Sequence, residues 1–134
     1  MKIKFKNLLL GFDDILEMKN NFTDQEFDEI EIGKAFGIAL KELRKHKNLS
    51  LKSLGNSVDI IDSTINRYEN GINIPTITQA IKIADFFDLP IEVFILLGLD
   101  HLQNNIDIPK SYEMLLSAFD KMRKDIAVAR ARKK

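Results

Sequence analysis

The sequence predicts an all-α protein in which five short helices form a compact bundle, with an N-terminal extension and one further C-terminal helix. Three observations carry this prediction. Apolar residues recur at helical spacing from about residue 27 onward, capping residues divide the chain at short intervals, and the stretch 2–7 gives only a weak strand signal. A chain of 134 residues suits one domain with an appendage.

The composition indicates a folded protein. It is 45% hydrophobic and 30% charged, so the chain can bury a core. The absence of cysteine excludes disulfides and thiolate metal sites. No apolar run approaches the roughly 18–20 residues of a membrane span. We therefore expect a cytoplasmic protein that does not contact a membrane.

The charge is balanced overall but unevenly distributed. A formal net charge of zero argues against a protein that binds nucleic acid by charge alone. Residues 1–31 hold eight acidic and four basic side chains, whereas residues 121–134 hold seven basic and one acidic. The two ends of the chain therefore carry net charges of opposite sign.

Residues 1–29 are interpreted as an acidic N-terminal extension. A strand at 2–7 and a helix at 8–18 are both weakly indicated, and the role of this segment stays open. Thr23 and Glu26 match a capping box, in which each side chain accepts from an amide at a helix start. From there apolar residues continue at helical spacing, which predicts one long helix or two helices broken near Gly33.

Two short helices should follow. Ser50 can cap the first, in which Leu51, Leu54 and Val58 share a face. Asp59 tolerates the left-handed backbone of a tight connection. The second helix, at about 62–69, should stop at the Asn-Gly pair of residues 70 and 71.

Two more helices complete the predicted bundle. Thr76 and Gln79 form a second capping box and open a helix. The residues expected to face inward from this helix are Ile77, Ala80, Ile81, Ala84 and Phe87. Pro90 suits the first turn of the last helix, which we expect Gly98 to end.

Residues 100–108 are interpreted as a polar connector and residues 109–134 as a separate helix with a basic tail. The apolar residues of this helix recur at alternating spacings of three and four: Tyr112, Leu115, Phe119, Met122, Ile126 and Ala129. Such a heptad-like seam needs a partner surface, which is either the chain's own bundle or a second copy. The basic tail is either solvated or a phosphate-binding arm.

The middle of the chain resembles a known family over about residues 32–98. The similarity lies in "LKELRKHKNLSLKSL", "STINRYENGINIP" and "AIKIADFFDLPIEVFI", and "I-x-R-Y-E-N-G-x-x-x-P" is the most specific part. These strings resemble the helix-turn-helix domain of phage-repressor-like regulators, the Cro/C1 or XRE family. The resemblance implies a DNA-binding domain at 30–99.

The resemblance also implies roles for individual residues. The second helix of the motif would enter the major groove. The candidates for base contacts are Asp62, Ser63, Thr64, Asn66 and Arg67. The candidates for phosphate contacts are Ser50, Lys52, Asn70 and Asn73. Arg44 and Glu69 would form a structural ion pair that orients this helix.

Several positions depart from the family pattern. Leu51 stands where the family usually has a phosphate-binding glutamine, Gly55 replaces a common alanine, and Asp59 replaces the turn glycine. Ile61 replaces the usual Ser or Thr cap of the recognition helix, which would move the cap to Asp62. A neutral domain without that glutamine should bind random DNA weakly.

The expected function is that of a sequence-specific DNA-binding transcriptional regulator. It would be a repressor that binds an inverted-repeat operator as a homodimer, with Tyr112, Leu115, Phe119, Met122 and Ile126 as candidates for the dimer surface. The alternative is a protein-interaction module on the same fold, antitoxin-like or a mobile-element accessory protein, with weak or no DNA binding. Its partner would contact the N-terminal extension or the C-terminal helix. The operator, the regulated genes and the inducing signal stay open.

The sequence does not indicate an enzyme. It contains no glycine-rich phosphate loop, no nucleophile elbow and no metal-ligand cluster. His46 and His101 are isolated from other catalytic or metal-binding residue types. We expect no cofactor and no bound metal.

Overall fold

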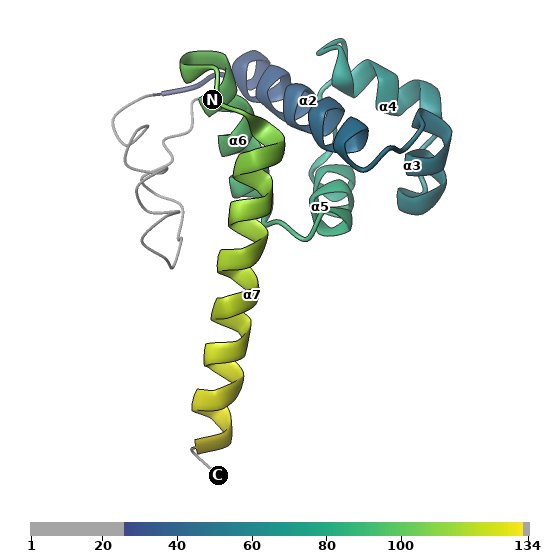
Figure 1. Cartoon of the computed structure of the whole chain (residues 1–134). Coiled ribbons are helices and arrows are strands. Elements are labelled where there is room, and N and C mark those ends of the chain that lie inside the picture. Colours follow the sequence, from purple (N-terminus) through teal and green to yellow (C-terminus); the bar gives the residue numbers. More distant parts are fainter. Residues whose placement is uncertain (1–25, 133–134) are drawn as a thin grey trace.

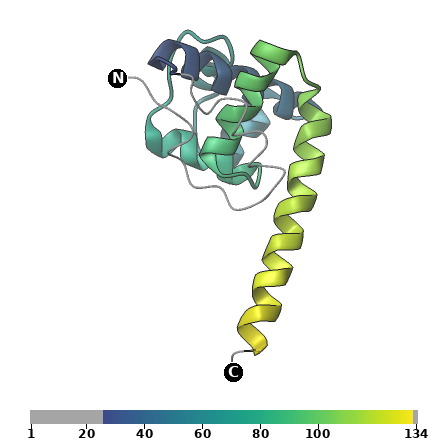
Figure 2. The same cartoon turned by 90° about the vertical axis from the view of Figure 1, so that its left-hand side faces the viewer.

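The computed structural model describes residues 26–132, which form six α-helices in that range (Figure 1). They are α2 (Glu29–His46), α3 (Leu51–Val58), α4 (Asp62–Glu69), α5 (Ile77–Phe86), α6 (Ile91–Asn104) and α7 (Ile108–Arg132). The first five and the start of α7 make a bundle, and the rest of α7 extends away from it in both views (Figure 1 and Figure 2). The all-α prediction is confirmed. The strand and helix predicted within residues 2–18 lie outside the described residues.

One hydrophobic core joins residues from all six helices. The helix α2 contacts α4, α6 and α7 and buries Phe36, Leu40 and Leu43. The Phe36 ring lies 4.7 Å from the Phe94 ring of α6, measured between centroids. Among the described residues, no helix is both long enough and apolar enough to cross a membrane.

The first helix of the bundle begins later than the sequence indicates. The side chain of Asp28 caps α2 by accepting a hydrogen bond from the Glu31 amide at 2.8 Å. Glu26 is not helical, so the capping box predicted there is wrong, and Thr23 lies outside the described residues. The helix continues without a break through Gly33. Asp28 is the residue whose carboxylate reaches a free amide of the first turn.

The inward face of α5 differs from the prediction. Ala80, Ala84 and Phe87 are buried as expected, but Ile77 and Ile81 are 73% and 44% exposed. Ile83 is fully buried instead. Residues 80, 83, 84 and 87 share one face of a helix, whereas 77 and 81 lie at its edge. The two isoleucines are therefore apolar side chains left on the surface.

Gly98 does not end α6, which continues to Asn104. A Cβ atom at position 98 would lie 1.8 Å from the carbonyl oxygen of Ala35, so glycine permits the close approach of α6 to α2. The residue that caps its C-terminus is Asn105, whose φ of 52° is left-handed. Residues 100–104, predicted as part of a connector, are helical.

The first half of α7 belongs to the core. Tyr112, Leu115 and Phe119 are 1%, 6% and 7% exposed, because they pack on the chain's own bundle. The hydroxyl of Tyr112 donates to the carbonyl of Phe87 at 2.8 Å. Burial, with the nearby charges of Asp88 and Glu113, raises the pKa of Tyr112 to about 12. The prediction that these three residues can form a dimer surface is wrong.

Gly98→Ala tests the close packing of α6 on α2. In an exposed helix, alanine would stabilise by about 1 kcal/mol relative to glycine. Here we expect the free energy of unfolding to fall by about 1–3 kcal/mol, because the added methyl group meets the Ala35 backbone. Urea unfolding measures the change. Leu102→Ala on the exposed side of α6 is the control, and equal stability of the two variants would contradict the close approach.

Candidate nucleic-acid interface

Helices α3 and α4 are joined by a tight turn. The hydroxyl of Ser50 caps α3 by accepting from the Ser53 amide at 3.0 Å. Asp59 adopts the predicted left-handed backbone, with a φ of 57°. The amide of Ile60 then donates to the carbonyl of Gly55 at 2.9 Å. A Cβ atom at Gly55 would lie 2.4 Å from the Ile60 carbonyl oxygen, so the tight turn requires glycine there.

The inner side of α4 is anchored by a charged contact. Arg44 Nε donates to Glu69 Oε2 at 2.6 Å, and Nη2 donates to Oε1 at 3.0 Å. Arg44 Nη1 also donates to the carbonyl of Leu49 at 2.8 Å. The hydrogen bond to Glu69 raises the pKa of Arg44 although burial opposes the shift. The pair that the family resemblance implies thus joins α2, the loop before α3, and the end of α4.

Ile65 and Tyr68 complete this anchored side. Ile65 is fully buried, and the hydroxyl of Tyr68 donates to Gln79 Oε1 on α5. Burial raises the pKa of Tyr68. Sequence reasoning missed this contact because it assigned Gln79 to a capping box. Only the Thr76 half of that box forms, with the Thr76 hydroxyl accepting from the Gln79 amide at 3.2 Å.

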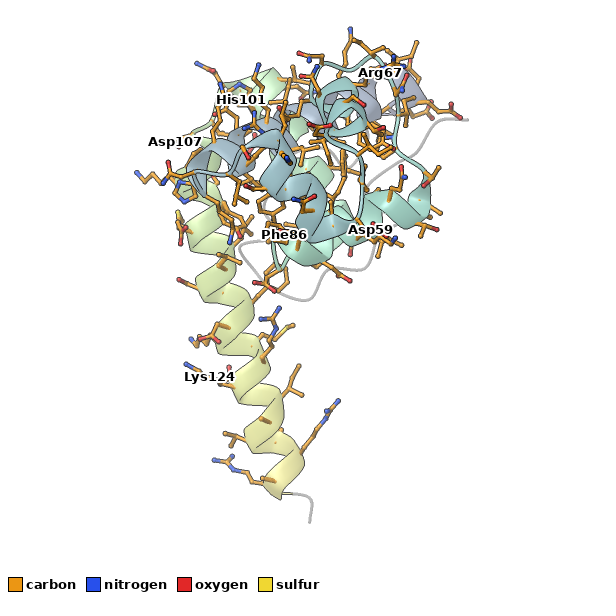
Figure 3. All side chains as sticks on the ribbon, turned by 90° about the vertical axis from the view of Figure 1, so that its right-hand side faces the viewer. Asp59, Arg67, Phe86, His101, Asp107 and Lys124 are labelled. Carbon is orange, nitrogen blue, oxygen red and sulfur yellow. The ribbon has the colours of Figure 1, made fainter. Side chains whose placement is uncertain are left out.

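The outer side of α4 presents a polar stripe of Ser63, Asn66, Arg67 and Asn70. Spacings of three and four place these residues on one face of the helix, and all four are exposed. Asp62 is exposed at the edge of the stripe, whereas Thr64 is partly buried. Arg67 lies on the bundle, far from Lys124 on the projecting part of α7 (Figure 3).

Several of these polar groups already have partners within the helix. Asp62 Oδ1 accepts from the Ser63 amide at 2.9 Å. The side-chain amide of Asn70 donates to the carbonyl of Asn66 at 2.9 Å and to its Oδ1 at 3.1 Å. The N-cap is Ile61, which makes no capping hydrogen bond through its side chain, so the predicted move of the cap to Asp62 does not occur.

The phosphate-contact candidates fall into two groups, one at each end of the motif. Ser50 and Lys52 lie at the start of α3, and both are exposed. The Ser50 hydroxyl also donates to Ser53 Oγ at 2.9 Å, so its hydrogen bonds are used within α3. Asn70 and Asn73 follow the end of α4, where Asn70 is exposed and Asn73 partly buried. Lys52 carries the positive charge in this group. Among the described residues, its side chain has no hydrogen bond of the kind that Ser50 makes.

The histidines have structural partners. His46 Nε2 lies 2.8 Å from Glu113 Oε1 on α7, and His101 Nδ1 lies 2.9 Å from the carbonyl oxygen of Ile106. Within residues 26–132, no group of three or more histidine, aspartate or glutamate side chains is placed to hold a metal ion. The site is therefore a surface of hydrogen-bonding side chains on one short helix.

Comparison with known proteins places this site in a family. Residues 40–94 match the family model described as helix-turn-helix, which spans α3, α4 and α5. A protein of Methanocella arvoryzae named "Putative HTH-type transcriptional regulatory protein" is 40% identical over 55 residues. That alignment covers 41% of this chain and 17% of the other protein. Residues 40–94 are thus similar to the helix-turn-helix family of the Cro/C1 type, and the match is confined to that part of the chain.

Proposed function

We propose that this chain is a sequence-specific DNA-binding transcriptional regulator that represses by occupying a promoter. The observation that carries the proposal is the exposed stripe of Ser63, Asn66 and Arg67 on a helix whose other side is fully anchored. A helix of this family places its N-terminal residues on base edges in the major groove. The relative from Methanocella arvoryzae supports the regulatory role by its name.

In the proposed complex, α4 lies in the major groove and α3 crosses the phosphate backbone. Arg67 can donate two hydrogen bonds to a guanine, which is worth about 1–3 kcal/mol of discrimination. Asn66 keeps both N–H donors of its side chain, because its contacts with Asn70 use only its two oxygens. Lys52 at the start of α3 is the proposed phosphate contact that sets the register.

We further propose that the regulator binds an inverted repeat as a homodimer. Since the net charge is zero, a single domain gains little from non-specific phosphate attraction, so affinity requires two half-sites. The proposed dimer surface is the outer part of the α7 seam, in which Met122 is partly buried and Ile126 and Ala129 are exposed. It continues the spacing of the buried residues Leu115 and Phe119 beyond the bundle.

A hollow of about 350 Å³ beside α7 supports this dimer. Its lining combines the carboxylates of Asp85 and Asp88 and the guanidinium of Arg123 with the apolar side chains of Phe119 and Met122, so its net charge is negative. The projecting end of α7 is basic and carries apolar residues, so it has the opposite charge to this hollow. In our proposal, the projecting end of one copy lies in the hollow of the other.

A second candidate function is a protein-interaction module on the same fold. It is favoured by exposed isoleucines in and after the loop that follows α4. Ile72, Ile74 and Ile77 are 67%, 49% and 73% exposed. Apolar side chains gathered on a surface mark protein contacts more often than phosphate contacts. Binding to such a partner would change little with salt, whereas binding to DNA releases counterions and weakens steeply as salt rises.

Capture of sheared DNA from the source of the protein tests the main proposal. We expect a few enriched fragments that share a two-fold-symmetric motif. Arg67→Ala should bind the recovered site roughly 5- to 150-fold more weakly, because one base-specific contact is lost. Lys110→Ala is the matched control and should leave binding unchanged, because Lys110 is an exposed cation at the start of α7 that lies in neither proposed interface. The absence of enrichment at low salt would favour the protein-interaction module.

Glu69→Ala tests whether the buried pair orients α4. Removal of one partner of such a pair costs about 3–5 kcal/mol, so we expect a lower melting temperature. Below that temperature, binding to the recovered site should weaken while the preferred bases stay the same, because the Glu69 side chain points into the protein. Calorimetry and fluorescence anisotropy measure the two effects. A normal melting temperature with unchanged affinity would count against an orienting role.

Ile126→Glu tests the proposed dimer surface. A charge in the seam should weaken the dimer by about 2 kcal/mol, which is roughly thirtyfold in its dissociation constant. Val128→Glu is the matched control, because Val128 is also apolar and 50% exposed but lies on another side of α7. Sedimentation velocity of the full chain distinguishes the variants. Equal dimerisation of both variants would overturn this surface.

A further inference from the structure

Ile61 is an exposed apolar residue at the start of the polar helix α4. Its side chain is 71% exposed, although the residues on both sides of it have contacts. Ile60 before it is buried, and Asp62 after it accepts from the Ser63 amide. Ile61 also makes no capping hydrogen bond. Neither packing within the chain nor capping of the helix therefore accounts for an isoleucine at this position.

The backbone of Ile61 is held firmly in place. Its carbonyl accepts from the amides of Thr64 and Ile65, at 2.9 and 3.1 Å, as the first hydrogen bonds of α4. The preceding turn is fixed by the left-handed Asp59 and by the contact between Ile60 and Gly55. Since a β-branched side chain has few χ1 rotamers, Ile61 presents a preformed apolar surface.

The surroundings of Ile61 are suited to a nucleotide. A hollow of about 230 Å³ lies between α3 and the start of α4, lined by Lys52, Asn56, Ile60, Ile61 and Asp62. Lys52 supplies a positive charge on the α3 side, and Ile61 supplies an apolar surface on the α4 side. A thymidine nucleotide has the matching chemistry, because it combines a phosphate with an apolar 5-methyl group in the major groove.

We propose that Ile61 is a specificity-determining residue that contacts the 5-methyl group of a thymine in each half-site. This inference rests on the proposed function, since it requires α4 to lie in the major groove. The thymine methyl is the apolar group that a base pair displays in that groove. In this proposal, the isoleucine at the N-cap recognises one base through a hydrophobic contact and not through a hydrogen bond.

The test uses the full chain and the tightest-binding duplex recovered by fragment capture. Each thymine of one half-site is replaced singly by deoxyuridine, which removes only the methyl group. For the wild type, we expect one replacement to weaken binding about fourfold, as for the loss of one buried methyl-sized group. Ile61→Ser should bind the thymine and deoxyuridine duplexes equally at that position.

Two further variants make the result specific. Ile30→Ser is the matched control, because Ile30 is 63% exposed but lies on α2, and this variant should keep the fourfold effect. Ile61→Ala repeats the test with a residue that cannot form hydrogen bonds, and its melting temperature verifies folding. If Ile61→Ser and Ile61→Ala show the wild-type response at every thymine, the inference is overturned while the proposed function stands. If the wild type binds no duplex specifically, the proposed function itself fails.

Discussion

The buried contact between Arg44 and Glu69 determines where α4 lies. The Glu69 side chain is 2% exposed, so its carboxylate has exchanged water for the guanidinium of Arg44. A buried pair of this kind adds little net stability, because the cost of removing both charges from water offsets their attraction. It does penalise any arrangement in which the carboxylate loses its partner. Helix α4 therefore has one favourable orientation, with Ile65 and Tyr68 inward and Ser63 and Arg67 outward.

The helices around α4 are set by close backbone contacts. A Cβ atom at Gly37 of α2 would lie 2.2 Å from the carbonyl oxygen of Tyr68, and one at Gly98 of α6 would lie 1.8 Å from that of Ala35. Both glycines are in helices, where they reduce helical propensity by about 1 kcal/mol relative to alanine. The packing that they permit joins α4 and α6 to α2. Their conformational cost is thus offset by contacts between elements far apart in the sequence.

The two halves of α7 differ in burial. The buried residues Tyr112, Leu115 and Phe119 make the first half part of the core, and the hydrogen bond from Tyr112 to the carbonyl of Phe87 ties it to the end of α5. Beyond Met122 the helix leaves the bundle and is exposed along its length (Figure 2). The first residues of the heptad-like seam thus pack in the core of the chain's own bundle. The remainder of the seam lies on the surface.

The helical class, the register of the motif and most helix caps could be predicted from the residue pattern alone. Caps at Ser50 and Thr76 and the left-handed Asp59 depend on neighbouring residues alone, so their chemistry can be read from short strings. Spacing also identifies the stripe of Ser63, Asn66 and Arg67, because the period of a helix is independent of its surroundings.

Other features depend on contacts between distant segments and could not be predicted from local patterns. Gly98 reads locally as a helix end, yet it is the point at which α6 meets α2, and the helix continues. Ile77 and Ile83 are equally apolar in sequence, but only the second faces the core. The spacing of apolar residues along α7 likewise does not indicate at which residue the helix leaves the bundle. Burial is a property of what lies opposite a residue, and that partner is set by packing between distant segments.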